Sequence, residues 1–409
     1  MPARSPGAAW RSPLVVIAAG CLIAMIGFGI RSIFGLFLDP MILDRGWDRE
    51  TFGLAMAIQN LLWGIGVPVA GAIADRFGPA RVLAGGAVVY MAGVWGMAEA
   101  ESAVALWMTG GVLTGLGVAF TAFSLAMASM AKVVGPERRS LALGLGTAAG
   151  SFGQVVFSPV GQGFIHAFGW HQAMLVLAGS ALLIIPLAFV LPRDQQAKGE
   201  PRNEQTLRAA LAEAGAHRGY VLLTLGFFVC GFHVSFIAVY FPSYVASIGL
   251  DPAIGAYSLS LIGLFNIAGA FMSGMLGQRY SKKCGLSGIY LARAVTITIF
   301  LLAPKTVVTI YVFSACMGLL WLSTVPLTTG IVAQIFGVRY MATLFGIVFL
   351  SHQIGSFSGV WLGGYLYDTI GSYDGVWWAG VVLGLAAAVV HLPIDEKPLA
   401  RLTPAPAAA

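Results

Sequence analysis

Charge is scarce in this sequence. Of its 409 residues, 23 are Lys or Arg and 17 are Asp or Glu, about 10%, whereas soluble proteins carry about a quarter charged residues. Cysteine is also rare, and the four thiols, at Cys21, Cys230, Cys284 and Cys316, show neither CxxC pairs nor metal-ligand spacing. The sequence has no P-loop and no soluble catalytic domain. These absences argue against an enzyme and an ATP-driven pump, and we expect no cofactor and no metal.

Long apolar runs fill most of the chain. Hydrophobic residues make up 58% of it, and the mean hydropathy is +0.84. A helix that crosses a hydrocarbon core of about 30 Å needs about 20 apolar residues. Twelve runs meet this requirement, so the sequence predicts an all-α membrane protein with 12 transmembrane helices. The runs are about 13–40, 49–74, 79–98, 102–131, 140–166, 169–192, 219–247, 254–277, 286–304, 306–335, 342–367 and 373–393.

One polar stretch divides the runs into two sets of six. It reads "PRDQQAKGEPRNEQTLRAALAEAGAHRG" and carries charges of both signs, with a short surface helix expected around Thr206 to Ala214. The predicted organisation is an N-terminal six-helix half (1–192), a cytoplasmic linker (193–218), a C-terminal six-helix half (219–393) and a cytoplasmic tail (394–409).

The basic residues indicate how the spans lie in the membrane. If both termini are cytoplasmic, 18 Lys and Arg fall in cytoplasmic segments, and only Arg45, Arg49 and Lys305 fall outside. This bias obeys the positive-inside rule, so we expect a multi-pass protein of the plasma (inner) membrane with both termini in the cytoplasm. The loop charges are scattered, which argues against a nucleic-acid partner. The two remaining cations, Arg31 and Arg293, lie within spans, and no carboxylate lies at that depth.

The two halves repeat each other, and one repeat carries a family motif. "GAIADRFGPARVL" follows the second run and "GMLGQRYSKK" follows the eighth. The first resembles the signature G-x-x-x-D-R-x-G-x-R of the major facilitator superfamily. This resemblance implies two pseudo-symmetric halves, and a loop that latches the cytoplasmic side of a transporter. The second copy has Gln278 where an Asp is usual. The motif positions are filled by Gly71, Asp75, Arg76, Gly78 and Arg81.

A narrower resemblance concerns the first two spans. "RSIFGLFL" followed by "GWDRETFG" resembles the start of the monocarboxylate-transporter branch, and "ERRSLALGLG" resembles its fifth span. The resemblance implies that Arg31 occupies a substrate-binding cation position. Eukaryotic members of that branch carry an Asp and an Arg in the eighth span, where this chain has Asn266 and Ala270. The pair of intramembrane cations also resembles the oxalate–formate exchangers.

Each polar residue within a span has a structural alternative to a binding role. Arg31 either faces a cavity or extends to the outer interface. Arg293 either contacts substrate, extends to the cytoplasmic side or braces the eighth span through backbone carbonyls. His233 and His352 either carry a coupling proton or bond across helices. The amides within spans either bond across helices or contact substrate. Tyr240 is a candidate aromatic cavity wall. The candidate substrate-binding residues are Arg31, Gln59, His233, Tyr240, Asn266, Arg293, His352 and Gln353.

Two functions remain open for such a chain. Membrane cations without an acid suit an anion, so the leading hypothesis is secondary transport of a small organic anion, a mono- or dicarboxylate, by alternating access. Coupling would be proton symport or anion exchange. The alternative is efflux of hydrophobic compounds, to which "GSFGQVVFSPVGQG" in the fifth span is a loose match. The expected partners are the anion, protons in the symport case and the lipid bilayer, and the chain is expected to act as a monomer.

Overall fold

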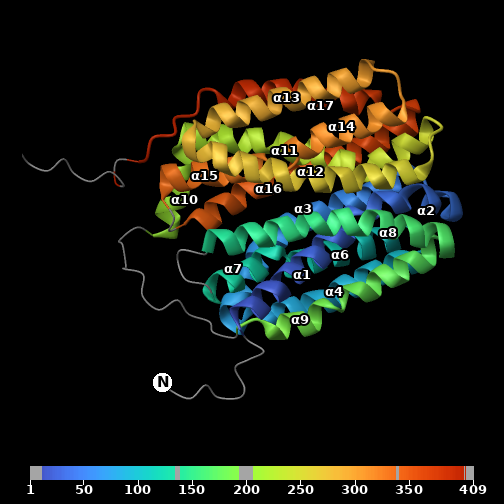
Figure 1. Cartoon of the computed structure of the whole chain (residues 1–409), viewed down its shortest axis with the longest axis horizontal. Coiled ribbons are helices and arrows are strands. Elements are labelled where there is room, and N and C mark those ends of the chain that lie inside the picture. Colours follow the sequence, from blue (N-terminus) through green and yellow to red (C-terminus); the bar gives the residue numbers. More distant parts are fainter. Residues whose placement is uncertain (1–11, 134–138, 193–205, 338–339, 400, 402–409) are drawn as a thin grey trace, which may run out of the picture.

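The computed structural model describes residues 12–133, 139–192, 206–337, 340–399 and 401. Within these ranges the chain is helical and contains no strand. Helices α1 to α9 pack together as one bundle, and helices α11 to α17 form a second bundle beside it (Figure 1). The long helices of both bundles run roughly parallel to one axis. The linker helix α10 (Leu207–Ala216) lies at one end of the molecule and α2 (Leu38–Arg45) at the other; we call these the α10 end and the α2 end.

Three of the six spans in the N-terminal bundle, the first, the fourth and the sixth, are interrupted. The first span bends through a 3₁₀ turn, η2, and the fourth is divided into short pieces. The elements are α1 (Pro13–Ser32), η2 (Phe34–Phe37), α2, α3 (Arg49–Phe77), α4 (Pro79–Glu99), α5 (Ala103–Leu106), the π-helix η3 (Trp107–Leu113), α6 (Thr114–Phe120), α7 (Phe123–Val133), α8 (Arg139–Ala181) and α9 (Ile184–Val190).

The C-terminal bundle has longer helices and one broken span. Thr206 caps the start of α10, which confirms the short helix expected in the linker. The tenth span breaks after Leu320 into two helices. The elements are α10, α11 (Arg218–Ser247), α12 (Pro252–Arg279), α13 (Lys282–Leu302), α14 (Val307–Leu320), α15 (Thr324–Phe336), α16 (Met341–Ile370) and α17 (Asp374–His391).

The structure confirms the predicted 12-span fold once a single glycine is considered. Among the described residues, 11 helical segments are long and apolar enough to cross a membrane, and one of them, Gly144–Val190, has 47 residues. At 1.5 Å per residue this segment would extend about 70 Å, more than twice a hydrocarbon core. Gly169 interrupts it with φ 81° and ψ 163°, a conformation that favours glycine, and the chain reverses there. The segment therefore supplies two spans.

The two bundles meet along two seams. One seam joins α3 to α16 and the other joins α8 to α12. Toward the α2 end the glycines at the seams are in tight contact: Gly53 and Gly364 pack against the Tyr240 hydroxyl and the backbone of the opposite helix. Toward the α10 end, a Cβ added at Gly71 or Gly346 would meet nothing within 4 Å. The bundles are thus pressed together at the α2 end and less closely packed at the α10 end.

Gly35 provides a test of this packing. A Cβ at Gly35 would collide with the backbone carbonyls of Ala238 and Val239 on α11, and backbone atoms cannot rotate away. We expect Gly35→Ala to lower the free energy of unfolding by about 1–3 kcal/mol through overpacking. In the control Gly163→Ala, the new methyl group meets nothing within 4 Å, and alanine favours the helix. Thermal unfolding in detergent compares the two, and equal melting temperatures would contradict the prediction.

Candidate functional site

Arg31 occupies the last turn of α1, directly before the break in the first span. The carbonyl end of a helix carries partial negative charge, which stabilises a cation in the last turn. The ion pairs of the described residues do not include Arg31. The helix end therefore offers this guanidinium a favourable position at membrane depth without a neighbouring carboxylate. The break itself was not predicted from the sequence.

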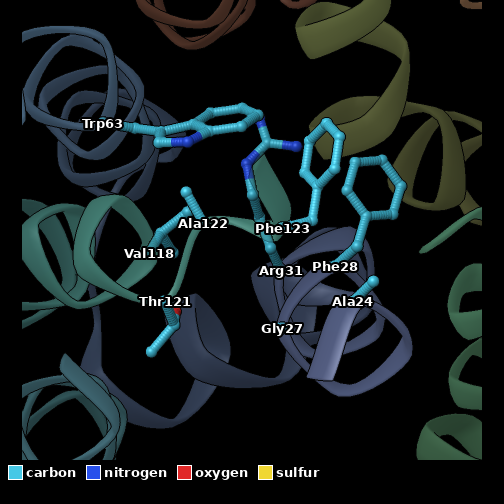
Figure 2. Close-up of a pocket in the computed structure, with 9 residues that line it drawn as sticks. All are labelled: Ala24, Gly27, Phe28, Arg31, Trp63, Val118, Thr121, Ala122 and Phe123. Carbon is cyan, nitrogen blue, oxygen red and sulfur yellow. The ribbon is translucent and has the colours of Figure 1, made fainter. Parts of the chain in front are cut away.

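The guanidinium of Arg31 is held by two side chains of α3. Its Nη2 donates to Oδ1 of Asn60 at 2.5 Å. Its central carbon lies 4.3 Å from the ring centroid of Trp63, in a cation–π contact that Figure 2 shows. Asn60 is oriented by its own amide, which donates to the Met56 carbonyl at 2.8 Å. Residues three apart share a helix face. Arg31 therefore points toward α3 in the protein interior and does not extend to the outer interface.

A small pocket surrounds this cation. Its volume is about 20 Å³, room for about one water molecule. Nε of Arg31 is buried and has no hydrogen-bond partner. A carboxylate is larger than water, so it could enter only if an aromatic side chain of the wall moved aside. The pocket is lined by Ala24, Gly27, Phe28, Arg31, Trp63, Val118, Thr121, Ala122 and Phe123 (Figure 2).

Aromatic rings connect this pocket to the other bundle. Trp63 meets Phe349 of α16 edge to face at 5.2 Å between ring centroids, and Phe349 stacks on His352 at 5.6 Å. His352 Nδ1 lies 3.4 Å from Oε1 of Gln353, whose side chain packs where Gly64 leaves room on α3. The structure thus brings two predicted site residues, His352 and Gln353, to the bundle boundary next to the Arg31 pocket.

Other candidate residues make interhelical hydrogen bonds. Gln59 donates to the Gly110 carbonyl at 3.2 Å, Tyr240 donates to the Val360 carbonyl at 2.9 Å, and His233 Nε2 lies 2.7 Å from the Gly380 carbonyl. Asn266 donates to Ser151 Oγ of α8 at 2.9 Å and accepts from the Leu322 amide at 3.0 Å. Among the described residues, the lining of the Arg31 pocket includes none of these four side chains.

Arg293 is fully buried in the C-terminal bundle. Nε and Nη2 donate to the Leu320 carbonyl at 3.2 and 2.7 Å, and Nη2 also donates to the Trp321 carbonyl at 2.5 Å. These carbonyls lie at the end of α14, where the tenth span breaks. Arg293 therefore braces the tenth span, and the expectation that it braces the eighth span was wrong. The structure does not place Arg293 at the Arg31 pocket.

The motif between the second and third spans forms the tight turn from α3 to α4. Gly78 has φ 88°, and its amide donates to the Ala74 carbonyl at 2.8 Å. Arg76 lies over the Phe77 ring at 5.2 Å, and Arg81 lines a separate apolar groove of about 510 Å³ between α3, α4 and α6. The side chain of Asp75 lies outside the described residues. A latching role of Gly71, Asp75, Arg76, Gly78 and Arg81 remains a prediction.

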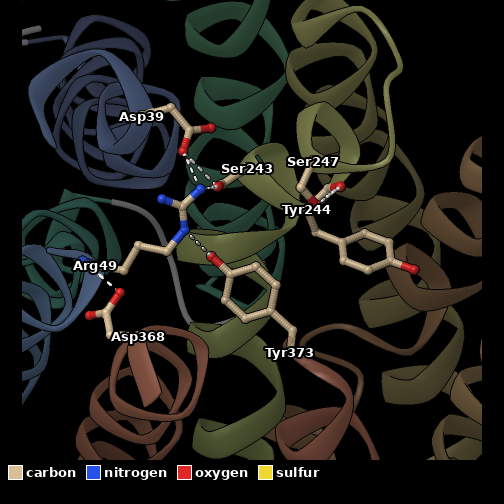
Figure 3. Close-up of polar contacts among 7 residues, drawn as sticks. All are labelled: Asp39, Arg49, Ser243, Tyr244, Ser247, Asp368 and Tyr373. Atoms are coloured by element: carbon tan, nitrogen blue, oxygen red, sulfur yellow. Dashed lines mark hydrogen bonds and ion pairs between the residues drawn. The ribbon is translucent and has the colours of Figure 1, made fainter. Parts of the chain in front are cut away.

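A polar network at the α2 end was not foreseen from the sequence. Arg49 pairs with Asp39 at 2.9 Å, and it donates to Ser243 Oγ and to the Tyr373 hydroxyl, both at 3.0 Å (Figure 3). Asp368 accepts the backbone amides of Arg49 and Glu50, at 3.2 and 2.6 Å. Ser243, Asp368 and Tyr373 belong to the C-terminal bundle, so Arg49 ties both bundles together. The sequence signal for this network was limited to the opposite charges of Asp39 and Arg49, which lie near the adjoining ends of the first two spans.

Known transporters share sequence and fold with this chain. It is 24% identical over 370 residues to "Monocarboxylate transporter 13" of Rattus norvegicus, covering 87% of this chain and 82% of the relative. It is 23% identical over 336 residues to "Uncharacterized MFS-type transporter YhjX" of Escherichia coli (strain K12), covering 80% and 83%.

Solved structures confirm the expected fold. The crystal structure of a D-xylose-proton symporter superposes with a TM-score of 0.73 at 16% identity, covering 95% of this chain and 99% of that one. An inward-facing, unoccupied bacterial homologue of the human lysosomal transporter Spinster also gives 0.73, at 15% identity and 95% and 96% coverage. The sequence model of the Major Facilitator Superfamily matches residues 17–359 and 223–409. The chain therefore belongs to the Major Facilitator Superfamily and is a membrane transporter, not an enzyme.

Proposed function

We propose that this transporter carries a small organic anion, a mono- or dicarboxylate, and that Arg31 holds a carboxylate of the substrate. The observation that carries the proposal is the Arg31 guanidinium, a fixed cation in an apolar-walled pocket at the bundle boundary, with one buried N–H free. The planar guanidinium suits a carboxylate geometrically. The name of the rat relative, a monocarboxylate transporter, supports the same substrate class.

The geometry suggests how such an anion would bind. A carboxylate that reaches Arg31 would take the place of the Asn60 amide oxygen on Nη2 and would also engage the free Nε. Trp63 and Phe349 would move apart, because their contact covers the pocket on the side of α16. His352 and Gln353 would then approach the anion from the C-terminal bundle. A ligand held by both bundles favours their closure around it, as alternating access requires.

The packing also suggests which side is open. The Arg49 network ties the bundles at the α2 end, while glycines toward the α10 end have free space. In the proposed plasma-membrane orientation, with both termini cytoplasmic, the α10 end faces the cytoplasm and the substrate would reach Arg31 from there. Proton symport and anion exchange are the two coupling modes for such a site, and the site as proposed is complete in a monomer.

A thermal-shift screen of the purified protein tests the substrate class. We expect small carboxylates near 100 times their dissociation constant to raise the melting temperature, because binding to the folded state adds about 2.7 kcal/mol of stability. The uncharged amides of the same acids are matched controls and should give no shift. Stabilisation by amines or lipophilic drugs, with none by the acids, would contradict the proposal and would favour efflux of hydrophobic compounds.

A further inference from the structure

The second membrane-depth cation, Arg293, has no carboxylate beside it in the described part of the chain. Its side chain is 0% exposed, and it bonds two backbone carbonyls and the thiol of Cys230, whose Sγ lies 3.5 Å from Nη2. Nη1 is buried without a partner. Arginine keeps its proton in proteins, and an uncompensated charge at this depth costs several kcal/mol. The carbonyl end of α14 offsets part of this charge, and a full negative charge beside Arg293 would offset the rest.

Among the described residues, Cys230 is the acid that hydrogen-bonds Arg293. Its sulfur lies 3.2 Å from Oγ1 of Thr324, at the start of α15, and the imidazole of His352 on α16 lies on another side of it. Cys230 and its bonding partners are buried. The close approach of α11 and α16 fixes this arrangement, since Gly231 packs directly on the His352 carbonyl. A thiolate is stabilised by neighbouring cations and donors, and here a guanidinium, an imidazole and a hydroxyl converge on one sulfur.

The other titratable groups around this cluster provide no alternative counter-charge. His233, on the same helix as Cys230, can supply only a neutral or positive ring, and its Nδ1 is buried without a partner. Tyr290 of α13 presents its ring to Arg293, with the ring centroid 5.4 Å from the guanidinium carbon, and its buried hydroxyl has no hydrogen-bond donor to stabilise a phenolate. On α17, His391 stacks on Tyr290 and can likewise supply only a neutral or positive ring.

We infer that Cys230 and Arg293 form a proton-binding site in the C-terminal bundle, with Cys230 as the proton acceptor. In the unloaded state the sulfur is a thiolate paired with Arg293, and in the loaded state it is a thiol. On release, the S–H bond breaks, its electron pair stays on sulfur, and the proton passes to a ring nitrogen of His352. On loading, the same proton transfer runs in reverse.

The site is placed to couple protons to the anion at Arg31. His352 lies near Cys230 and stacks on Phe349, and Phe349 meets Trp63 over Arg31. Movement of Trp63 and Phe349 on anion binding would therefore alter the environment of His352. This coupling role rests on the proposed anion transport, and it favours proton symport over exchange. The thiolate itself does not depend on that proposal.

The ionisation state of Cys230 can be measured directly. In a full-length protein with Cys21, Cys284 and Cys316 replaced by Ser, the remaining thiol gives an ultraviolet thiolate absorbance, with the additional Cys230→Ser variant as the blank. We expect a thiolate that is already present at neutral pH and disappears on acidification. An ordinary cysteine ionises only around pH 8.5. A thiol that stays protonated up to that pH would overturn the inference, whatever the substrate proves to be.

Transport measurements test the coupling. In proteoliposomes with a pH gradient of about one unit, proton symport by the parent should concentrate a monovalent anion about tenfold, because one unit is worth 1.36 kcal/mol. We expect Cys230→Ser to abolish this accumulation while lowering exchange of labelled for unlabelled anion far less. Cys230→Asp, which restores an acid beside Arg293, should recover accumulation. Parent-like accumulation by Cys230→Ser would overturn the coupling role, whereas absence of anion transport in the parent would refute the proposed function alone.

Discussion

Arg31→Ala is expected to reduce the initial rate of carboxylate uptake at least about 30-fold, since removing one partner of a buried charge pair costs about 2–5 kcal/mol. The loss is large because the pocket offers the anion one fixed cation between mostly apolar walls. Arg31→Lys keeps the charge but loses the planar fork, so it should retain an intermediate rate. The measurement is uptake of a labelled carboxylate, chosen from the thermal-shift screen, into proteoliposomes.

The control for this experiment is Arg208→Ala, which removes an exposed arginine of the linker helix α10. It removes one positive charge, as Arg31→Ala does, and leaves the Arg31 pocket unchanged. Both variants should elute as single species and unfold cooperatively before their transport is compared. If Arg31→Ala transported carboxylates as fast as Arg208→Ala, Arg31 would not be the carboxylate site.

Arg49→Ala is expected to open the α2 end. The substitution removes an ion pair to Asp39 and two hydrogen bonds to the opposite bundle, at Ser243 and Tyr373. Hydrogen bonds to charged groups contribute about 1.5–3 kcal/mol each. A net loss of about 3 kcal/mol would shift the balance between closed and open forms about 100-fold. Spin labels at the exposed residues Leu43 and Ile370, one on each bundle, should show longer distances in this variant.

Arg45→Ala is the matched control for Arg49→Ala. Arg45 lies four residues earlier, but its described contacts, with Asp44, the Ala98 carbonyl and the Trp170 ring, all belong to the N-terminal bundle. Its removal should leave the distance between the labels unchanged. An unchanged distance in Arg49→Ala as well would mean that helix packing at Gly35 and Gly364 closes the α2 end without the network.

The sequence was sufficient for the features that depend on composition and periodicity. Span length, loop charge and the Gly71–Arg81 motif predicted the family, the number of helices and the two cations within spans. The sequence was not sufficient to predict how each helix is rotated about its axis. Gln59 was chosen as a site residue, but the neighbouring Asn60 contacts Arg31. Adjacent residues of a helix point about 100° apart, so a small error in rotation exchanges them. The Arg49 network joins residues more than 300 positions apart in the chain, and local patterns carry no information on such pairs.

The seam between α8 and α12 determines how the two bundles can move. Gln154 donates to the Leu259 carbonyl at 2.9 Å, Ser260 donates to the Val155 carbonyl at 2.8 Å, and Asn266 reaches Ser151. If these helices parted, lipid could not replace the lost hydrogen bonds. The α3–α16 seam is different, because near Trp63 and Phe349 it is held by an aromatic contact that can slide. We therefore expect α8 and α12 to stay in contact while the bundles rock, and the α3–α16 side, where Arg31 lies, to undergo the larger displacement.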